Sequence, residues 1–332
     1  MEKKIKINEN QIFDEAISQI EKQFGKGTVS YLNGEAENIE VIPSGSIFLD
    51  KALGVGGYPK GRIIEIFGNE SSGKTTIALQ AVAQCQKQGG KCAYVDLEHA
   101  LDANFVKAIG VDLSKLLIAQ PDSAEQAVSL IEALIKTGMI DLIVVDSVAA
   151  MVPNTEFEGN ISDQTIGLHA RLMSKSLRII QALIAKDPTT LIFINQIREK
   201  VGVMFGNNET TTGGRALRFY ASVRIELRRS ELLKNGNDIV GIKTCAKIVK
   251  NKVAPPLEKA FIDIYFNKGI DHAGEIIDFA LEKNIIEKRG SWFYLDEEKI
   301  GQGRDATKEI LVNNPELFEK IKAKLSATDK KD

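Results

Sequence analysis

The eight residues from Gly68 to Thr75, which read Gly-Asn-Glu-Ser-Ser-Gly-Lys-Thr, constrain the fold of this chain more than any other segment. They match the pattern G-x-x-x-x-G-K-[ST] and stand between an apolar run of strand length, residues 62–67, and a helical stripe from Thr75 to Gln88. Glycines let backbone N–H groups curl around phosphates, and the first turn of a helix adds positive potential. A chance glycine turn would lack these flanking elements, so the segment predicts a phosphate-binding loop in an α/β fold.

The side chains of this loop predict which groups hold a nucleotide. Lys74 can reach the β and γ phosphates of ATP, and the Thr75 hydroxyl can ligate Mg²⁺. Asp146 ends the apolar run 142–146, as expected of a carboxylate that holds the magnesium through water. Many buried strands end in Asp, but beside a phosphate-binding loop the signal is strong. The predicted nucleotide contacts are Gly68, Asn69, Glu70, Ser71, Ser72, Gly73, Lys74, Thr75 and Thr76, and the predicted metal ligands are Thr75 and Asp146.

Glu98 is a candidate for the catalytic base. It follows the apolar run 92–96, so in a parallel sheet it emerges at the same carboxyl edge as Lys74 and Asp146. A carboxylate there can take a proton from the water that attacks the γ phosphate. On this spacing alone, a solvated loop residue or a helix cap is the better interpretation.

Several short apolar runs predict a mostly parallel central sheet flanked by helices. Residues 92–96, 142–146 and 191–195 are almost continuously apolar, which is typical of strands buried on both faces. Residues 219–228 alternate more clearly and predict a half-exposed antiparallel strand. The Ser123-x-x-Gln126 capping box predicts the start of a further helix.

Sequence breaks divide the chain into parts. Residues Gln11 to Phe24 have the apolar spacing of an amphipathic helix, and a Gly-Lys-Gly turn separates them from the rest of the chain. After His272, two helical stretches around residues 291–295 predict a small α+β domain. We therefore expect an N-terminal arm over 1–38, a core over 39–270, a C-terminal domain over 271–325 and a disordered tail over 326–332.

Composition predicts a cytoplasmic protein without a membrane segment. No stretch approaches the ~18 consecutive apolar residues of a membrane helix, and the first residues lack the apolar region of a secretory signal. The three cysteines are sparse and have no metal-type spacing, which indicates a reducing compartment. Because 43 basic residues face 45 acidic ones, any nucleic-acid surface must be local.

Long segments of the chain resemble the bacterial RecA recombinase family. The resemblance is carried by residues 40–76, 94–102, 144–153, 194–224 and 247–256, and it extends from Gln11 to Leu325 with the motifs in the family's order. It implies a RecA-type ATPase core with a small polymerisation arm and a small C-terminal domain. It also implies a DNA-dependent ATPase that forms helical filaments on single-stranded DNA and exchanges strands with double-stranded DNA. Stimulation of LexA repressor self-cleavage is a further property that the resemblance implies.

The resemblance assigns roles to residues around the nucleotide. Glu98 falls on the family's catalytic base, and Gln196 on the residue that senses the γ phosphate, although its spacing alone fits a strand-end cap. Asp102 and Phe105 fall where the family contacts adenine. Phe105 replaces the more usual Tyr, so stacking is retained and a hydroxyl contact is not. Asn69 replaces a Pro that is common at this position, a change that should matter little.

Two segments resemble the family's DNA-facing loops, Glu158–Ile166 and Ile197–Thr212. The second is rich in glycine and too long for an ordinary connection, so it is either functional or a mobile surface. Arg198 and Lys200 are its candidate phosphate contacts. Met204 and Phe205 are apolar groups that could hold stretched bases apart.

A predicted helix from Gly167 to Ala185 carries further candidate DNA contacts. Arg171, Ser174 and Arg178 fall at i, i+3 and i+7, which places them on one face. Basic residues on one face are more often solvated, but here the positions match the family's DNA contacts. The same is true of Gly213 and Gly214, whose bare amides can approach phosphates. We interpret the nearby His169 as structural.

Lys250 and Lys252 match paired lysines that, in the family, reach from one subunit to the ATP of its neighbour. Two solvated lysines on a loop would give the same pattern. The Gln11–Phe24 helix could dock on the next subunit or fold back on its own core. A ring-forming helicase and a non-catalytic scaffold are the competing functions. The match through both DNA loops disfavours the helicase, and Glu98 disfavours the scaffold.

Overall fold

The computed structural model describes residues 9–29, 39–158, 167–199 and 209–329 of this chain. Residues 1–38 and 39–332 form separate compact units. The first unit contains helix α1 (Glu9–Phe24), which confirms the amphipathic helix expected there. Its apolar side chains Ile12, Phe13, Ile20 and Phe24 are exposed.

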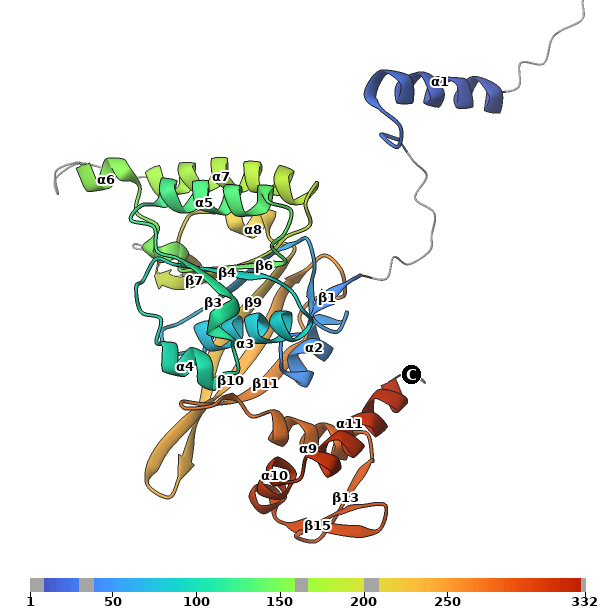
Figure 1. The fold of residues 1–332 in the computed structure, drawn as a ribbon, viewed down its shortest axis with the longest axis vertical. Coiled ribbons are helices and arrows are strands. Elements are labelled where there is room, and N and C mark those ends of the chain that lie inside the picture. Colours follow the sequence, from blue (N-terminus) through green and yellow to red (C-terminus); the bar gives the residue numbers. More distant parts are fainter. Residues whose placement is uncertain (1–8, 30–38, 159–166, 200–208, 330–332) are drawn as a thin grey trace, which may run out of the picture. The chain divides into compact units, whose positions relative to one another are not determined.

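The second unit is built on a twisted sheet with the strand order β12-β11-β10-β9-β3-β7-β6-β4-β5 (Figure 1). The strands from β9 to β5 in this order are mutually parallel, and β10, β11 and β12 continue the sheet in antiparallel fashion. The mostly parallel α/β sheet expected from the apolar runs is therefore confirmed. The strand bounds are β3 (Ile63–Gly68), β4 (Cys92–Asp96), β5 (Leu116–Ala119), β6 (Leu142–Asp146), β7 (Thr190–Glu199), β9 (Val223–Asn235), β10 (Asp238–Asn251), β11 (Lys259–Tyr265) and β12 (Gly269–Ile270).

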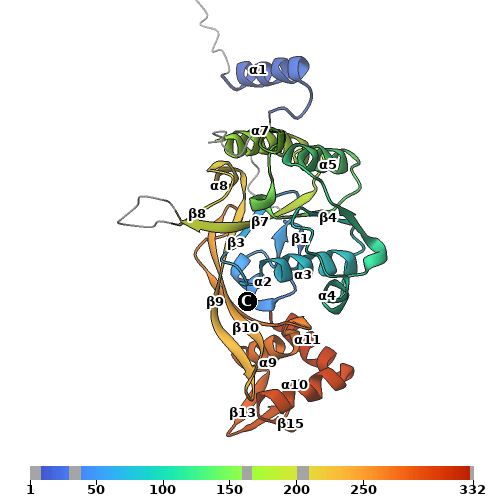
Figure 2. The same cartoon turned by 90° about the vertical axis from the view of Figure 1, so that its left-hand side faces the viewer.

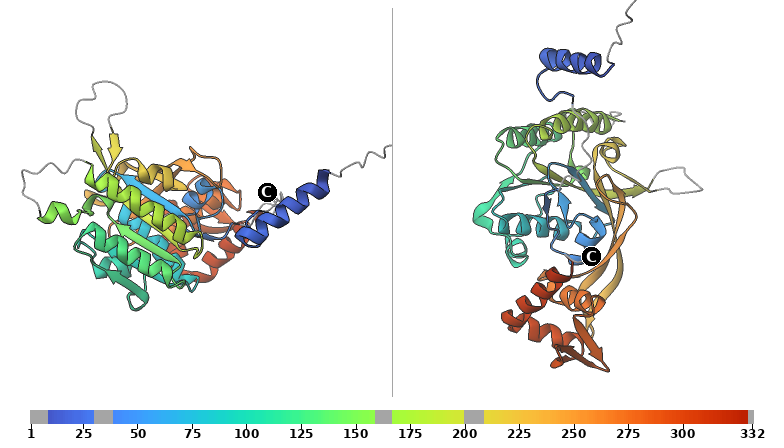
Figure 3. Two further views of the ribbon diagram at one scale, coloured as in Figure 1. Left: turned by 90° about the horizontal axis from the view of Figure 1, so that it is seen from above. Right: turned by 90° about the vertical axis from the view of Figure 1, so that its right-hand side faces the viewer.

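Helices cover both faces of the sheet (Figures 2 and 3). Successive residues of a strand point to opposite faces, so Ile64 and Ile66 pack under α3 while Ile63 packs toward α5 and α7. Both faces of β3 are thus apolar, which explains its continuous hydrophobic sequence. On the first face lie α2 (Ile47–Leu53), α3 (Lys74–Lys87) and α4 (Ala103–Ala108), and on the second α5 (Ala124–Lys136), α7 (Leu168–Ile184) and α8 (Ala216–Tyr220).

The capping box before α5 is confirmed in part. The Ser123 hydroxyl accepts from the backbone N–H of Gln126, at 3.2 Å. The Gln126 side chain bonds back to the N–H of Asp122, at 2.7 Å, rather than to that of Ser123. The start of α5 therefore still has two capping hydrogen bonds, one accepted by Ser123 and one accepted by Gln126.

Three sequence expectations about this unit are wrong in detail. Residues 219–222 do not begin a strand, because α8 ends at Tyr220 and β9 starts at Val223. In addition, β9 is not simply antiparallel, since it pairs in parallel with β3 and in antiparallel with β10. The segment expected to be an irregular loop from Ile197 is paired at its base, where β7 continues to Glu199 opposite β8 (Glu209–Thr211).

The C-terminal region is an α+β domain, with more elements than its sequence indicated. An antiparallel sheet of β13 (Ile286–Arg289), β14 (Trp292–Leu295) and β15 (Glu298–Gln302) packs with α9 (His272–Glu282), α10 (Arg304–Asn313) and α11 (Pro315–Asp329). Helix α11 includes residues 326–329, so the expectation of a disordered tail from residue 326 is wrong for these positions. The remaining short elements are β1 (Val41–Ile42), β2 (Tyr58–Pro59), α6 (Asn154–Glu158) and the 3₁₀ turns Leu113–Lys115 and Val148–Ala150.

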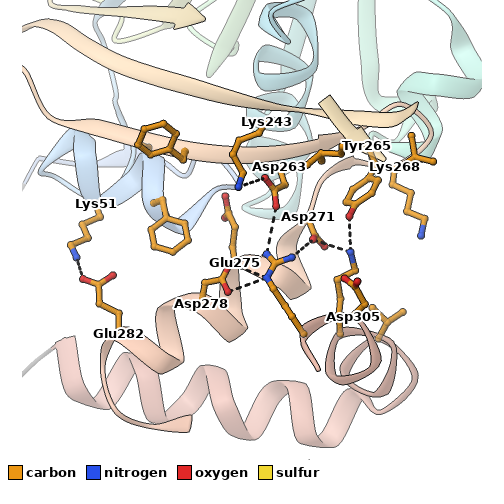
Figure 4. A pocket seen from close by; sticks show the side chains of 18 of the residues that line it. Lys51, Lys243, Asp263, Tyr265, Lys268, Asp271, Glu275, Asp278, Glu282 and Asp305 are labelled. Atoms are coloured by element: carbon orange, nitrogen blue, oxygen red, sulfur yellow. Dashed lines mark hydrogen bonds and ion pairs between the residues drawn. The ribbon is translucent and has the colours of Figure 1, made fainter. Parts of the chain in front are cut away.

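Ionic contacts join this domain to the core across a groove (Figure 4). Arg304 of α10 lies 2.7 Å from Asp278 and 3.6 Å from Asp263 of β11. Glu275 of α9 is buried and accepts from the Ser46 hydroxyl, at 2.6 Å, and from the N–H of Ile47, at 2.9 Å. Glu275 of α9 therefore caps the distant helix α2, and burial raises its pKa to about 8.

Candidate nucleotide and DNA site

The phosphate-binding loop connects β3 to α3 through two positions that require glycine. A Cβ atom at Gly68 would lie 2.2 Å from the carbonyl oxygen of Leu227 on β9. Gly73 has φ +89°, and a Cβ there would lie 2.6 Å from Cδ1 of Ile264. The backbone of β9 thus excludes a side chain at Gly68, and the left-handed backbone conformation disfavours one at Gly73.

The start of α3 is arranged to receive an anion. Its N-cap residue is Gly73, which has no side chain to bond the first N–H groups of the helix. The carbonyl of Asn69 accepts from the Ser72 hydroxyl, at 2.8 Å, and from Nζ of Lys74, at 2.7 Å. Burial lowers the pKa of Lys74, and nearby carboxylates oppose this shift. The loop fits a phosphate, because the negative charge of a phosphate would stabilise the partly buried ammonium group of Lys74.

Asp146 faces Thr75 from the end of β6. Its Oδ2 accepts from the Thr75 hydroxyl, at 2.9 Å, and from the Tyr94 hydroxyl, at 2.6 Å. Burial raises the pKa of Asp146, these two hydroxyls lower it, and the nearby Glu98 and Asp96 raise it further. Mg²⁺ prefers oxygen ligands, usually one or two protein groups together with phosphates, so the Thr75 hydroxyl and the Asp146 carboxylate fit this ion.

Glu98 lies at the same edge of the sheet, just beyond β4. Its Oε1 accepts from the Ser147 hydroxyl and from Nε2 of Gln196, the latter at 3.1 Å. Gln196 in turn pairs with Gly68 in the parallel register of β3 and β7. The four neighbouring strands β3, β7, β6 and β4 therefore bring Lys74, Asp146, Glu98 and Gln196 into one site.

The candidate adenine residues lie on α4. Asp102 is the N-cap of this helix and accepts from the N–H groups of Asn104, at 2.7 Å, and Phe105, at 3.3 Å. Phe105 is partly buried against the core under α3. Both positions have a structural role, and contact with adenine stays a prediction.

The candidate DNA contacts on α7 share a solvent-facing side. Arg171 and Arg178 are exposed, and the Ser174 hydroxyl donates to the carbonyl of Ala170, at 2.8 Å. Gly213 and Gly214 both have positive φ values, and a Cβ at Gly214 would lie 2.8 Å from Cβ of Ala170. These glycines are needed for close packing on α7, whether or not their amides bind phosphate.

Other DNA-loop candidates are only partly described. Arg198 is exposed on β7, where it pairs with Thr210 of β8. Lys200, Met204, Phe205 and residues 159–166 lie outside the described residues. His169 fits the structural interpretation, because its ring packs beside Gly213 and burial lowers its pKa.

The two candidate trans-acting lysines lie before the level of the phosphate loop along β3, and Lys250 is level with Glu65 in the middle of that strand. Lys250 donates to the carbonyls of Arg218, at 2.6 Å, and Phe219, at 3.0 Å, and burial lowers its pKa. Lys252 is exposed, and its N–H bonds the carbonyl of Ser222, whose own N–H bonds the carbonyl of Ile63. Lys252 is therefore level with the first residue of β3, whereas the phosphate loop follows the last.

Sequence reasoning missed several polar partners in the site. Tyr94 and Ser147 hold the two acidic residues, and Asp96 lies beside Asp146 in the strand register. The only sequence signal was that Tyr94 and Asp96 alternate along one face of β4. Which carboxylate the tyrosine would meet depends on strand order, which the sequence does not state.

No helix in the described ranges is long and apolar enough to span a membrane.

Comparison with known proteins gives matches over almost the whole chain. The RecA N-terminal domain family matches residues 11–271, and the RecA C-terminal domain family matches residues 274–328. Protein RecA of Malacoplasma penetrans (strain HF-2) is 56% identical over 316 residues, which cover 95% of each chain. Protein RecA of Acholeplasma laidlawii is 55% identical over 316 residues, covering 95% of this chain and 96% of the relative. Protein RecA of Bacillus mycoides (strain KBAB4) is 56% identical over 309 residues, covering 93% and 90%.

Proposed function

This chain belongs to the RecA family, and on that basis we propose how its residues couple ATP hydrolysis to DNA strand exchange. It is a DNA-dependent ATPase that forms filaments on single-stranded DNA and catalyses homologous pairing and strand exchange in recombination and DNA repair. It uses ATP and Mg²⁺, and it binds single-stranded DNA, double-stranded DNA and further copies of itself.

The observation that carries the proposed mechanism is the convergence of Lys74, Asp146 and Glu98 at one sheet edge. Lys74 leaves the Asn69 carbonyl and binds the β and γ phosphates. Thr75 and Asp146 would hold the magnesium ion, which would supply positive charge to the phosphates. Glu98 takes a proton from the water that attacks the γ phosphorus. Asp102 and Phe105 bind the adenine at the outer end of the same site.

Gln196 links this site to the DNA loop. Its side chain bonds Glu98, and its strand continues through Arg198 and Glu199 to the segment 200–208. A γ phosphate that accepts from Nε2 of Gln196 would change this bond and move the end of β7. Gln196 thereby senses the nucleotide and transmits its presence to the loop.

Lys250 and Lys252 act on the ATP of a neighbouring subunit. Lys252 lies level with Ile63, and the strand from Ile63 to Gly68 spans about 16 Å at roughly 3.3 Å per residue. Lys250 lies level with Glu65, about 10 Å before Gly68 on the same scale, and its Nζ is bound to the carbonyls of Arg218 and Phe219. Both separations exceed the reach of a lysine side chain, so we expect neither ammonium group to reach the phosphate loop of its own subunit. In a filament, they would stabilise transition-state charge in trans, as arginine fingers do.

The DNA-facing surface consists of α7 and the loop after β7. Arg171, Ser174, Arg178 and Arg198 contact phosphates, and the amides of Gly213 and Gly214 approach them from the base of the loop. Lys200 adds a further phosphate contact in the segment outside the described residues. Met204 and Phe205 separate bases there, which holds the DNA in a stretched form.

Three finer assignments complete the proposal. Residues 1–38 act as the polymerisation arm, residues 39–270 as the core and residues 271–325 as the C-terminal domain. The protein works in the cytoplasm. Its activated filament stimulates LexA repressor self-cleavage, which is tested by incubating LexA with the filament and ATP and monitoring the cleavage products.

A single experiment tests the main proposal. ATP turnover is measured with and without single-stranded DNA, and the same samples are imaged by electron microscopy. We expect DNA-stimulated turnover together with open helical filaments. Closed rings would favour a helicase, and nucleotide binding without phosphate release would favour a scaffold.

A further inference from the structure

Tyr94 is a buried tyrosine whose hydroxyl reaches the nucleotide site. It lies in the middle of β4, its side chain is 1% exposed, and its ring belongs to the apolar core under α3. Its hydroxyl donates to Oδ2 of Asp146, at 2.6 Å. A buried hydroxyl without a partner is unfavourable by roughly 1–3 kcal/mol, so this position needs either an apolar ring or an acceptor, and Asp146 is the acceptor.

The strand register explains how the hydroxyl reaches the carboxylate. Strands β4 and β6 are parallel neighbours, with Tyr94 opposite Val144 and Asp96 opposite Asp146. Tyr94 therefore lies two residues below Asp146, about 6.6 Å along the strand at roughly 3.3 Å per residue. Side chains in strands lean along the strand direction, and the length of a tyrosine ring covers this separation. A phenylalanine would fill the same volume and stop short of the carboxylate.

The carboxylate of Asp146 is held through one oxygen. Both hydroxyl donors, Tyr94 and Thr75, bond Oδ2, which directs Oδ1 away from them. Thr75 is also a proposed magnesium ligand, so its hydroxyl group would be shared with the ion when nucleotide is bound. Tyr94 lies inside the core and stays clear of the ion. It is the donor whose position does not depend on the metal.

The charges around Asp146 make this bond more important than an ordinary core hydrogen bond. Asp96 lies beside Asp146 in the strand register, and Glu98 lies close enough to raise the pKa of Asp146. Repulsion from these carboxylates would rotate Asp146 away from a fixed orientation. A charge-assisted O–H···O⁻ bond is about twice as strong as a neutral one, which is enough to select one rotamer.

We propose that Tyr94 is a positioning residue for magnesium, because its hydroxyl fixes the Asp146 carboxylate with Oδ1 turned toward the ion of the bound nucleotide. This inference rests on the proposed role of Asp146 as a magnesium ligand. Tyr94 itself contacts neither the nucleotide nor the metal.

The test is Tyr94→Phe, read out by magnesium binding rather than by turnover. The melting temperature is recorded as Mg²⁺ is titrated into protein saturated with a non-hydrolysable ATP analogue. Loss of a group that orients a metal ligand weakens metal affinity by roughly 10–100-fold. Because Asp146 holds the ion through water, we expect the lower end, about a tenfold rise in the half-saturating Mg²⁺ concentration. Binding of the analogue without Mg²⁺ should stay unchanged.

Tyr58 provides the matched control. It is also fully buried, and its hydroxyl has no hydrogen-bond partner among the described residues. Tyr58→Phe should therefore leave the Mg²⁺ midpoint unchanged. An unchanged midpoint in Tyr94→Phe, or an equal shift in both variants, would overturn the positioning role.

Asp146→Asn separates this inference from the proposed function. If Asp146→Asn raises the Mg²⁺ midpoint and Tyr94→Phe does not, only the inference about Tyr94 is wrong. If Asp146→Asn leaves the midpoint unchanged, the magnesium role of Asp146 is wrong and the inference falls with it. A shift in both variants, larger for Asp146→Asn, is the expected result.

Discussion

The nucleotide edge, which is the sheet edge that carries Asp146, Glu98 and Gln196, differs from the outer face of α7 in how its polar side chains are held. At the nucleotide edge, the polar side chains already bond one another, as Thr75 and Tyr94 do with Asp146 and as Gln196 does with Glu98. On α7, no hydrogen bond or ion pair within the described ranges holds the guanidinium group of Arg171 or Arg178. One site is organised before its ligand arrives, and the other is a row of solvated cations.

Packing explains this difference. The nucleotide edge lies where buried strands end, so its polar groups need partners inside the protein. α7 buries only its inner side, through residues such as Met173, Leu177 and Ile180. Its outer side is free of packing constraints. We infer that a single substitution at the nucleotide edge strongly impairs ATP binding or hydrolysis. A single substitution on α7 should remove only one positive charge from the DNA-facing surface.

Lys74→Ala is expected to have the largest effect. Removing this ammonium group takes away the main positive charge on the β and γ phosphates, so ATP turnover should fall below detection and productive ATP binding should be lost. Equilibrium binding of a fluorescent ATP analogue and phosphate release measure the two effects. A variant that binds and hydrolyses ATP normally would contradict the view that this edge is preorganised around one cation.

Glu98→Gln should lower turnover by roughly 10²–10⁴-fold while leaving ATP binding and filament assembly intact, because it removes a general base and keeps the shape. Single-turnover phosphate release and electron microscopy give the two readouts. Glu287→Gln is the matched control, since Glu287 is 58% exposed in the C-terminal domain. Near wild-type turnover in Glu98→Gln would remove this residue from the mechanism.

The same contrast explains what the sequence could predict. The phosphate loop, α3 and Asp146 could be recognised from local patterns, because a strand, a loop and a helix are adjacent in the chain. The parallel sheet could be inferred from apolar runs, which reflect burial on both faces. Apart from the role of Asp146, which was recognised only because the chain also has a phosphate loop, these features are each determined by neighbours within a few residues.

Contacts between distant residues could not be predicted in this way. Tyr94 and Asp146 are 52 positions apart, and Gln196 and Glu98 are 98 positions apart. Their meeting depends on which strands are neighbours in the sheet. The family resemblance supplied the role of Gln196 but not its partner, and it gave no role to Tyr94.

Local patterns also misled at particular places. Phe219 and Tyr220 are aromatic residues at the start of a run that fits a strand, but they belong to α8, which leaves Phe219 largely exposed. The paired segments of β7 and β8 are largely polar, with Arg198 opposite Thr210. Hydrophobic alternation cannot reveal such a pair, because neither of its faces is an apolar core.

The next prediction tests whether one subunit contains a complete nucleotide site or needs lysines from its neighbour. Lys250→Ala should lose turnover while its own phosphate loop stays intact, and an equal mixture with Lys74→Ala should regain activity. In randomly mixed filaments, about a quarter of adjacent pairs would combine one intact phosphate loop with one intact lysine pair. Turnover of the mixture should therefore reach about a quarter of the wild-type value.

Each mutant mixed with itself should stay inactive. Lys259→Ala changes an exposed lysine on the neighbouring strand β11 and should behave as wild type. If mixed filaments form and no activity returns, Lys250 acts within its own subunit. The register argument for action in trans would then be wrong, and the assignment of the phosphate loop would stand.

Arg171→Ala is expected to have the smallest effect, and it tests the additive character of α7. Binding to single-stranded DNA should weaken as salt rises, since each neutralised phosphate releases counterions. Losing one phosphate contact should reduce the slope of log K against log salt by about 0.7, which means that the variant loses about threefold less affinity than wild type between 50 and 200 mM salt. Fluorescence anisotropy with a labelled oligonucleotide measures this slope. Lys136→Ala removes a cation of α5 that is paired with Glu132 and 60% exposed, and it should leave the slope unchanged. If Arg171→Ala changed neither slope nor affinity, Arg171 would be a solvated surface residue. If it abolished binding altogether, α7 would resemble the nucleotide edge, and the contrast between the two regions would fail.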